Sequence, residues 1–206
     1  SSAITNIGGS GTITLDAGTG TLTMSAGSTV ITATGDITIS ADSASLAGQI
    51  QTGGEIKIAP DTDTVTINLG GAGSGGGLEL SEAELNTLES IIIRIGDGTG
   101  ASPYTATPTS GNITFTGAFA ADAQFAGQYL ELRTTGTVTG TAAVIDFSNA
   151  TSTSDLVVRS GGVVDLGTAA HDFNGIAIST GGTNSTVTVN DTDDMAITTI
   201  DGLSGI

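Results

Sequence analysis

The sequence contains no cysteine and no tryptophan, and aromatic residues make up only 3% of its 206 positions. A globular core of this size normally relies on Phe, Tyr and Trp, because each of these side chains buries a large area. The interior is therefore expected to be narrow and filled by Ile, Leu, Val and Ala. Without cysteine the fold has no disulfide, which suits a repetitive β-structure with long hydrogen-bonded ladders.

Positive charge is also scarce, since Lys57, Arg94, Arg133 and Arg159 are the only Lys and Arg residues beside 21 acidic ones. Binding to phosphate groups requires clustered Lys and Arg, so a net charge of −17 excludes nucleic acids and anionic membrane surfaces as partners. The acidity instead favours solubility, repulsion between fibres and loose attraction of divalent cations. No run of 18 apolar residues occurs, so the sequence predicts no transmembrane helix and no membrane insertion.

Short segments in which a polar residue, most often Thr, alternates with an apolar one recur along the chain, at residues 12–15, 21–24, 36–39, 55–58 and 64–67. Alternation with a period of two is typical of a strand with one dry face and one wet face. The aliphatic set is expected to stack in the interior: Ile13, Leu15, Ile37, Ile39, Ile56, Ile58, Val65 and Ile67. The residues between them are expected to face solvent: Thr14, Thr38, Lys57 and Thr66.

The spacing of these segments predicts a repeating turn. Ile13 and Leu22 lie nine residues apart, as do Ile56 and Val65, while Ile37 and Ile56 lie 19 apart. With glycine-rich corners between the segments, this spacing favours a parallel β-solenoid, most simply a β-helix, of roughly ten turns at ~4.8 Å each. An antiparallel sandwich would use similar corners, but these only weakly resemble the Asn-Gly and Asp-Gly pairs that tight hairpins prefer.

The repetition is interrupted in the middle, which divides the chain into residues 1–71, 72–110 and 111–206. The first part is expected to hold regular turns, and the last to continue them less regularly around larger residues, since all five Phe lie there. The middle part combines a glycine-rich loop, a short helix and a strand. Ser81 and Glu84 fit a capping box at the start of that helix, within residues 81–89.

Four segments carry a resemblance to a known family: residues 35–42 (GDITISAD), 78–86 (LELSEAELN), 93–97 (IRIGD) and 185–202. They resemble pieces of the filamentous-haemagglutinin-like adhesins, very large repetitive exoproteins that bacteria export by two-partner secretion. The resemblance implies a right-handed parallel β-helix that serves as a shaft or adhesive surface, outside the cell or on its surface. The secretion domain of that family has no counterpart here, and we expect the chain to be part of a longer or processed polypeptide.

Few residues are candidates for chemistry. His171 is the only histidine, and we interpret it as a loop or turn residue rather than a member of a triad with Asp172. Acidic residues cluster at Asp61 and Asp63, which we interpret as a solvated turn. A second cluster, Asp191, Asp193 and Asp194, is the better candidate for a Ca²⁺ site, because hard cations prefer carboxylate oxygens.

Two further motifs carry weaker signals. The glycine-rich residues 70–77 lack the Gly-Lys-Ser/Thr ending of a phosphate-binding loop and are interpreted as a linker. Four asparagines match the glycosylation sequon, a match that arises often by chance in a chain rich in Ser and Thr: Asn112, Asn149, Asn184 and Asn190.

The sequence therefore predicts a non-enzymatic structural shaft or filament segment of a bacterial surface adhesin, without a catalytic site and with Ca²⁺ as the only cofactor considered. Its expected partners are neighbouring β-helical turns or copies of itself, end to end. The alternative hypothesis is an adhesive module that binds glycans or proteins of a host or neighbouring cell through residues 72–80 and 96–110. A polysaccharide-degrading β-helix enzyme ranks below both, because such enzymes need paired carboxylates with Arg or Lys on one face.

Overall fold

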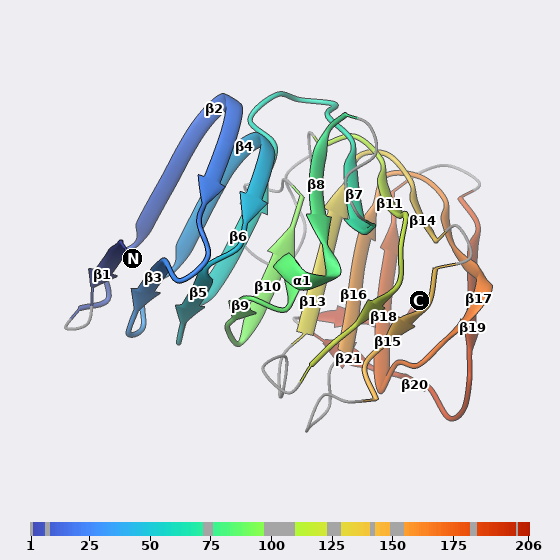
Figure 1. Ribbon diagram of the computed structural model, residues 1–206. Helices are drawn as coiled ribbons and strands as arrows, with labels where there is room; N and C mark the ends of the chain where they lie inside the picture. The colour runs from blue at the N-terminus through green and yellow to red at the C-terminus, as the bar shows by residue number, and fades with distance from the viewer. Residues whose placement is uncertain are drawn as a thin grey trace.

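A computed structural model describes residues 2–6, 9–71, 76–96, 110–122, 129–140, 143–148, 155–181, 185–200 and 202–206. Nearly all of the regular structure is β-strand, with one four-residue helix among the described residues. Four of the five sheets are parallel, and only the small β21–β22 pair is antiparallel (Figure 1). The predicted all-β class and the parallel pairing of its strands are therefore confirmed.

The largest sheet contains eight strands, and their order across the sheet is their order along the chain. They are β2 (Ile13–Met24), β4 (Ile37–Leu46), β6 (Glu55–Ala59), β10 (Ile92–Ile95), β13 (Tyr129–Thr134), β16 (Asp155–Ser160), β18 (Gly175–Thr180) and β20 (Ala196–Ile197). Each return of the chain thus adds the next strand to the same edge. Eight strands, rather than the roughly ten turns expected, span this sheet.

Two further parallel sheets accompany it. The six-stranded sheet consists, in order, of β19 (Val187–Asp191), β17 (Val164–His171), β14 (Val138–Gly140), β11 (Ile113–Phe115), β7 (Ile67–Gly70) and β8 (Leu78–Ser81). The four-stranded sheet consists of β1 (Ala3–Asn6), β3 (Thr29–Thr32), β5 (Gln49–Thr52) and β9 (Leu88–Glu89). The small pairs are β12 (Phe119–Ala120) with β15 (Ile145–Asp146), and β21 (Thr199–Ile200) with β22 (Leu203–Ser204).

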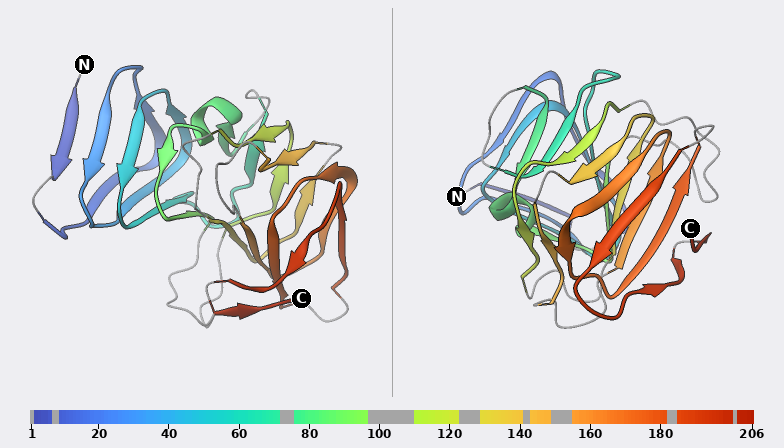
Figure 2. Two further views of the ribbon diagram at one scale, coloured as in Figure 1. Left: turned by 90° about the horizontal axis from the view of Figure 1, so that it is seen from below. Right: turned by 90° about the vertical axis from the view of Figure 1, so that its right-hand side faces the viewer.

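The chain visits these sheets in a repeating order. From β2 to β5 it alternates between the eight-stranded and the four-stranded sheet, and from β6 onward every pass through the eight-stranded sheet up to β18 is followed by a strand of the six-stranded sheet. Figures 1 and 2 show the strands following one another along the molecule from β1 and β2 at one end to β17 and β19 at the other. The segment 72–110 does not interrupt this order, because its strand β10 pairs with β6 on one side and β13 on the other.

The register confirms one of the predicted spacings and corrects the other. Ile37 lies opposite Ile56, so a spacing of 19 residues is one full return of the chain. Ile13 and Leu22, nine residues apart, belong instead to the single strand β2, which bends at Gly18 where the pairing with β4 is irregular. Gly18 has a φ of +57°, a conformation that glycine adopts without steric cost, so this glycine bends a strand rather than ending it.

The nine-residue spacing between Ile56 and Val65 does not mark two successive strands either. Val65 is half-buried and precedes β7, which begins at Ile67, because residues 61–64 form a turn that includes Thr64 at a φ of +72°. The predicted strand at 64–67 is therefore wrong by three residues at its start. A positive φ in a β-branched residue is uncommon, and neither composition nor alternation signals it.

The interior is one apolar cluster, with buried residues from Met24 on β2 to Ile178 on β18. Ile37, Ile39, Ile56, Ile58 and Ile67 are at most 1% exposed, as predicted. Ile13 and Leu15 on the terminal strand β2 are half-buried and pack against the same cluster. The residues expected to face solvent do so, since Thr14 and Thr66 are exposed and Thr38 and Lys57 are partly exposed.

Larger side chains fill the second half of the interior, as the distribution of Phe predicts. Phe115, Phe119, Phe147 and Phe173 are buried, whereas Phe125 lies outside the described residues. The rings of Phe119 and Phe147 meet edge to face with centroids 6.0 Å apart, and Phe173 follows 5.9 Å from Phe147. Contacts between aromatic rings thus replace part of the aliphatic packing of the first half.

The helix α1 (Glu82–Leu85) begins with the predicted capping box, in which the Ser81 hydroxyl accepts from the Glu84 N–H and the Glu84 carboxylate accepts from the Ser81 N–H. Leu85 and Leu88 are buried. The helix is shorter than the predicted 81–89, because residues 88–89 pair with β5 as β9. Pairing in the four-stranded sheet thus competes successfully with a second helical turn.

Candidate functional site

All four Lys and Arg residues of the chain lie on the outer face of the eight-stranded sheet. Lys57 on β6 lies beside Arg94 on β10, and Arg94 lies beside Glu131 on β13. Arg133 on β13 lies opposite Arg159 on β16. This grouping follows from the register alone, since inner positions such as Leu130 and Leu156 fix which alternate residues point outward.

Glu131 is the centre of this cluster, which we call the Glu131 cluster and define as Arg94, Glu131, Arg133 and Arg159. The Glu131 carboxylate is 0% exposed and accepts the Nε–H groups of Arg133 at 2.7 Å, Arg159 at 2.6 Å and Arg94. The three arginine residues are themselves at most 9% exposed. A carboxylate surrounded in this way has its lone pairs committed to the protein.

The electrostatics of Glu131 result from two opposing effects. Burial alone would raise the pKa of Glu131, but hydrogen bonds from Arg133 and Arg94, with their positive charges, outweigh it and hold the pKa below its usual value. The carboxylate therefore stays ionised. At the rim of the cluster, Arg94 also pairs with Glu55, and the Lys57 ammonium lies 3.3 Å from Glu55 and 3.8 Å from Asp36.

The Glu131 cluster was not predicted from the sequence. The signal was present in the spacing: Leu130 and Leu156 pair across neighbouring strands, and Arg133 and Arg159 share the same offset of 26 residues. The alternation of inward and outward residues along a strand places both arginines on the outer face, which is normally exposed to solvent. That rule fails here because the outer face of β13 and β16 is itself buried.

His171 is buried in β17, so its interpretation as a loop or turn residue is wrong. Its Nδ1 accepts the main-chain N–H of Ile145 at 3.0 Å, and its ring stacks on Phe173 with centroids 5.1 Å apart. Burial lowers the pKa of His171, while the Leu166 carbonyl and the Asp191 charge partly oppose this effect. A triad histidine must donate from Nδ1 to its carboxylate, and an Nδ1 that accepts from Ile145 carries no proton to donate.

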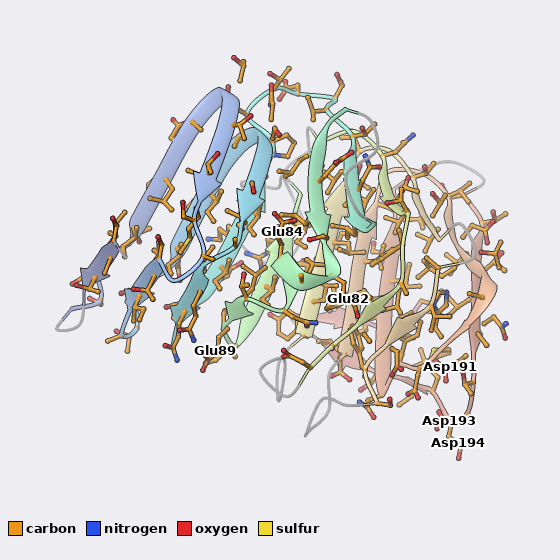
Figure 3. The ribbon with its side chains drawn as sticks, viewed as in Figure 1. Glu82, Glu84, Glu89, Asp191, Asp193 and Asp194 are labelled. Carbon is orange, nitrogen blue, oxygen red and sulfur yellow. The ribbon has the colours of Figure 1, made fainter. Side chains whose placement is uncertain are left out.

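The calcium candidates lie at the end of β19 (Figure 3). Asp191 accepts the Phe173 N–H at 2.9 Å through one oxygen and the Asp193 N–H at 3.3 Å through the other, whereas Asp193 and Asp194 are exposed. Burial, with the nearby charges of Asp193, Asp146 and Asp191, raises the pKa of Asp172. No group of three or more acidic or histidine side chains positioned to hold a metal occurs among the described residues, and the calcium site stays a prediction.

The other acidic cluster and the sequons can be placed only in part. Asp61 and Asp63 lie exposed in the turn that follows β6, consistent with their interpretation as a solvated turn. Asn112 and Asn190 are exposed, while Asn149 and Asn184 lie outside the described residues. Of the loops proposed to bind partners, residues 72–75 and 97–109 also lie outside them.

A groove of about 520 Å³ opens between the end of β4 and the helix α1. Its lining residues are Ala44, Leu46, Ala47, Glu79, Ser81, Ala83, Glu84 and Thr87. The Glu84 carboxylate at this groove accepts the Leu46 N–H at 2.8 Å besides capping the helix.

Of the other carboxylates labelled in Figure 3, Glu82 accepts the Ala120 N–H, and Glu89 accepts from Gln49 and Gln51. These glutamates connect segments that lie 38 to 40 residues apart in the sequence.

Comparison of the chain with protein-family models, with curated proteins and with solved structures returns no match. Among the described residues, no helix has the length and apolar character needed to cross a membrane.

Proposed function

We propose that the chain is a right-handed parallel β-helix and that it serves as a non-enzymatic shaft segment of a large bacterial surface adhesin, outside the cell or on its surface. The observation that carries the proposal is the register of the eight-stranded sheet, in which successive strands stack in parallel over one continuous apolar interior. Such a stack transmits load through ladders of main-chain hydrogen bonds. Crossovers between parallel strands of one sheet are right-handed in about 98% of cases, which favours that hand here.

The most buried polar groups also support a structural role. The Glu131 carboxylate is occupied by three arginines, and His171 accepts a main-chain N–H through Nδ1. Both groups hold neighbouring turns together, since Glu131 joins β10, β13 and β16, and His171 joins β17 to β15. Polar groups used in this way favour a rigid rod over a reactive surface.

Duplication of one turn tests the β-helix directly. Because Ile37 and Ile56 are one return apart, a second copy of residues 37–55 inserted after Glu55 supplies a whole extra turn. A stacked fold accepts this insertion, with its unfolding temperature within a few degrees of the parent and slow amide exchange in the new strands. The matched control is an insertion of the same 19 residues in scrambled order, which should lower stability sharply. Loss of folding in both variants would reject the proposal.

The adhesive alternative has one observation in its favour. The groove beside α1 includes Glu79 and Ser81 from β8 and has the volume of a small-ligand site. Glu79 belongs to residues 72–80, where the sequence predicts a binding surface. Binding to a glycan array that is lost on substitution of Ser81 and Thr87 by Ala would favour the adhesive module, whereas a shaft predicts no glycan signal at any concentration tested.

A further inference from the structure

The helix α1 lies where the chain crosses from β8 of the six-stranded sheet to β9 of the four-stranded sheet (Figure 1). A strand at this place could pair its main chain with the turns on either side, whereas a helix uses its main chain internally. The Glu82 carbonyl accepts the Asn86 N–H at 3.0 Å. The Glu84 carbonyl accepts the Thr87 N–H at 3.1 Å. The segments that flank α1 therefore need other partners for the main-chain groups that face it.

One flanking segment is β12, where alternate residues direct their main-chain groups to opposite sides. Phe119 and Ala121 donate their N–H groups to carbonyl groups in and beside β15, so the N–H and carbonyl groups of Ala120 point away from β15. The Glu82 carboxylate accepts the Ala120 N–H at 3.2 Å, and the Asn86 amide donates to the Ala120 carbonyl at 3.0 Å. Two side chains thus give Ala120 the hydrogen bonds that a neighbouring strand would give it.

The other flanking segment is β4. Ala47, just after β4, donates its N–H to the Met24 carbonyl of β2, so the N–H of the preceding Leu46 points away from β2. The Glu84 carboxylate accepts this N–H at 2.8 Å through one oxygen and the Ser81 N–H at 2.9 Å through the other. One carboxylate therefore connects β4 to the N-cap of α1.

The spacing of these three side chains explains how one helical turn reaches both segments. Glu82 and Asn86 are four residues apart, so they lie on the same side of the helix and both reach β12. Glu84 is two residues from each and lies on the opposite side, toward β4 (Figure 3). Asn86 extends the contact with the β12 segment, because its Oδ1 accepts the Asp122 N–H at 3.2 Å.

We propose that Glu82, Glu84 and Asn86 are positioning residues that join β4 to β12 across α1, in place of the main-chain pairing that a strand would supply. We call these three residues the helical joint. Because the joint acts through side chains, the chain can carry a helix and the groove beside it while the segments on either side stay in place. The joint requires only the parallel stacking of the turns, so it goes beyond the proposed shaft and does not depend on it.

Amide hydrogen exchange, measured residue by residue by NMR, tests the joint because each side chain protects a different amide. Each Ala variant should speed exchange about fivefold to tenfold at one amide, as expected for one lost hydrogen bond. The pairs of variant and amide are E82A with Ala120, E84A with Leu46, and N86A with Asp122. Ala is at least as good a helix former as Glu or Asn, so the response does not come from lost helix propensity. E84A also removes the capping of Ser81, whereas E82A and N86A leave it intact.

Two controls separate the joint from a general loss of stability. E82Q keeps an oxygen that can accept the Ala120 N–H and should restore its slow exchange. E89A removes a carboxylate that accepts from the side chains of Gln49 and Gln51, and it should leave all three amides as they are in the wild type.

Two results would overturn the proposal. One is unchanged exchange at all three amides in the Ala variants. The other is equal acceleration at the Phe119 amide, which donates on the β15 side and has no contact with the joint through its N–H. The turn duplication leaves residues 82–86 intact, so the proposed shaft is tested separately.

Discussion

Arg133 on β13 and Arg159 on β16 lie directly opposite each other, and both donate Nε–H to the same oxygen of Glu131, at 2.7 and 2.6 Å. Like charges opposite each other on adjacent strands repel. Their arrangement is stable only because one buried carboxylate lies between them and takes a further bond from Arg94. One acidic residue therefore holds three of the four Lys and Arg residues of the chain.

Replacement of Glu131 by Gln should destabilise the fold by about 3–5 kcal/mol, because it leaves buried arginine charges without their carboxylate. Urea unfolding followed by circular dichroism at neutral pH measures the loss. The control is Asp194→Asn, which removes an exposed carboxylate and should leave the unfolding midpoint unchanged. Equal midpoints for E131Q and wild type would show that Glu131 does not balance the arginines.

Replacement of Ile37 by Asp should also cost several kcal/mol, since it places a charge among the stacked side chains of Ile13 and Ile56. The matched control is Ile197→Asp, because Ile197 is 59% exposed on β20. Thermal unfolding of the two variants should separate them clearly. A melting temperature of I37D within a degree or two of wild type would contradict the interior position of Ile37.

The regular part of this fold could be read from the sequence because alternation and stacking obey the same rule. The apolar positions of the local alternation are the buried positions of the fold, as at Ile37, Ile39, Ile56 and Ile58. Local pattern and tertiary packing therefore agree. The capping box of Ser81 and Glu84 is equally local and equally readable.

The features that sequence reasoning missed depend on contacts between distant turns. Glycine is a signal for a corner and for a bulge alike, so nothing local distinguishes the bend at Gly18 from a chain reversal. Glu131 and its arginines come together only through register over three strands, and alternation alone marks them as solvated. His171 is placed by the N–H of Ile145, 26 residues away, to which no motif points.

Replacement of Gly18 by Ala should cost about 1–2 kcal/mol, because the residue has a φ of +57° and L residues resist the left-handed region. The added methyl group itself has room, since its nearest neighbour would be the Asp61 carboxylate at 4.0 Å. Gly181→Ala is the control, with an ordinary φ and a nearest contact of 3.8 Å. If both variants unfold at the same urea concentration, the bend of β2 is not held in that conformation.

Stability should fall as the pH is lowered through the titration range of His171. Burial holds the pKa of this histidine below its ordinary 6.5 in the folded state, so the unfolded chain binds a proton more readily than the folded one. By linkage the free energy of unfolding then decreases as the pH falls from above 6.5 toward the folded-state pKa. The raised pKa values of Asp155 and Asp172 act in the opposite sense, because those groups favour the folded state as the pH falls.

Asn in place of His171 keeps an acceptor for the Ile145 N–H without titrating. Urea unfolding of both proteins between about pH 7.5 and 5.5 should show a decline for wild type that H171N lacks, and His171 is the only histidine that could cause it. A wild-type stability that rises relative to that of H171N as the pH falls over this range would mean that the Asp191 carboxylate outweighs burial and that His171 is protonated in the folded protein.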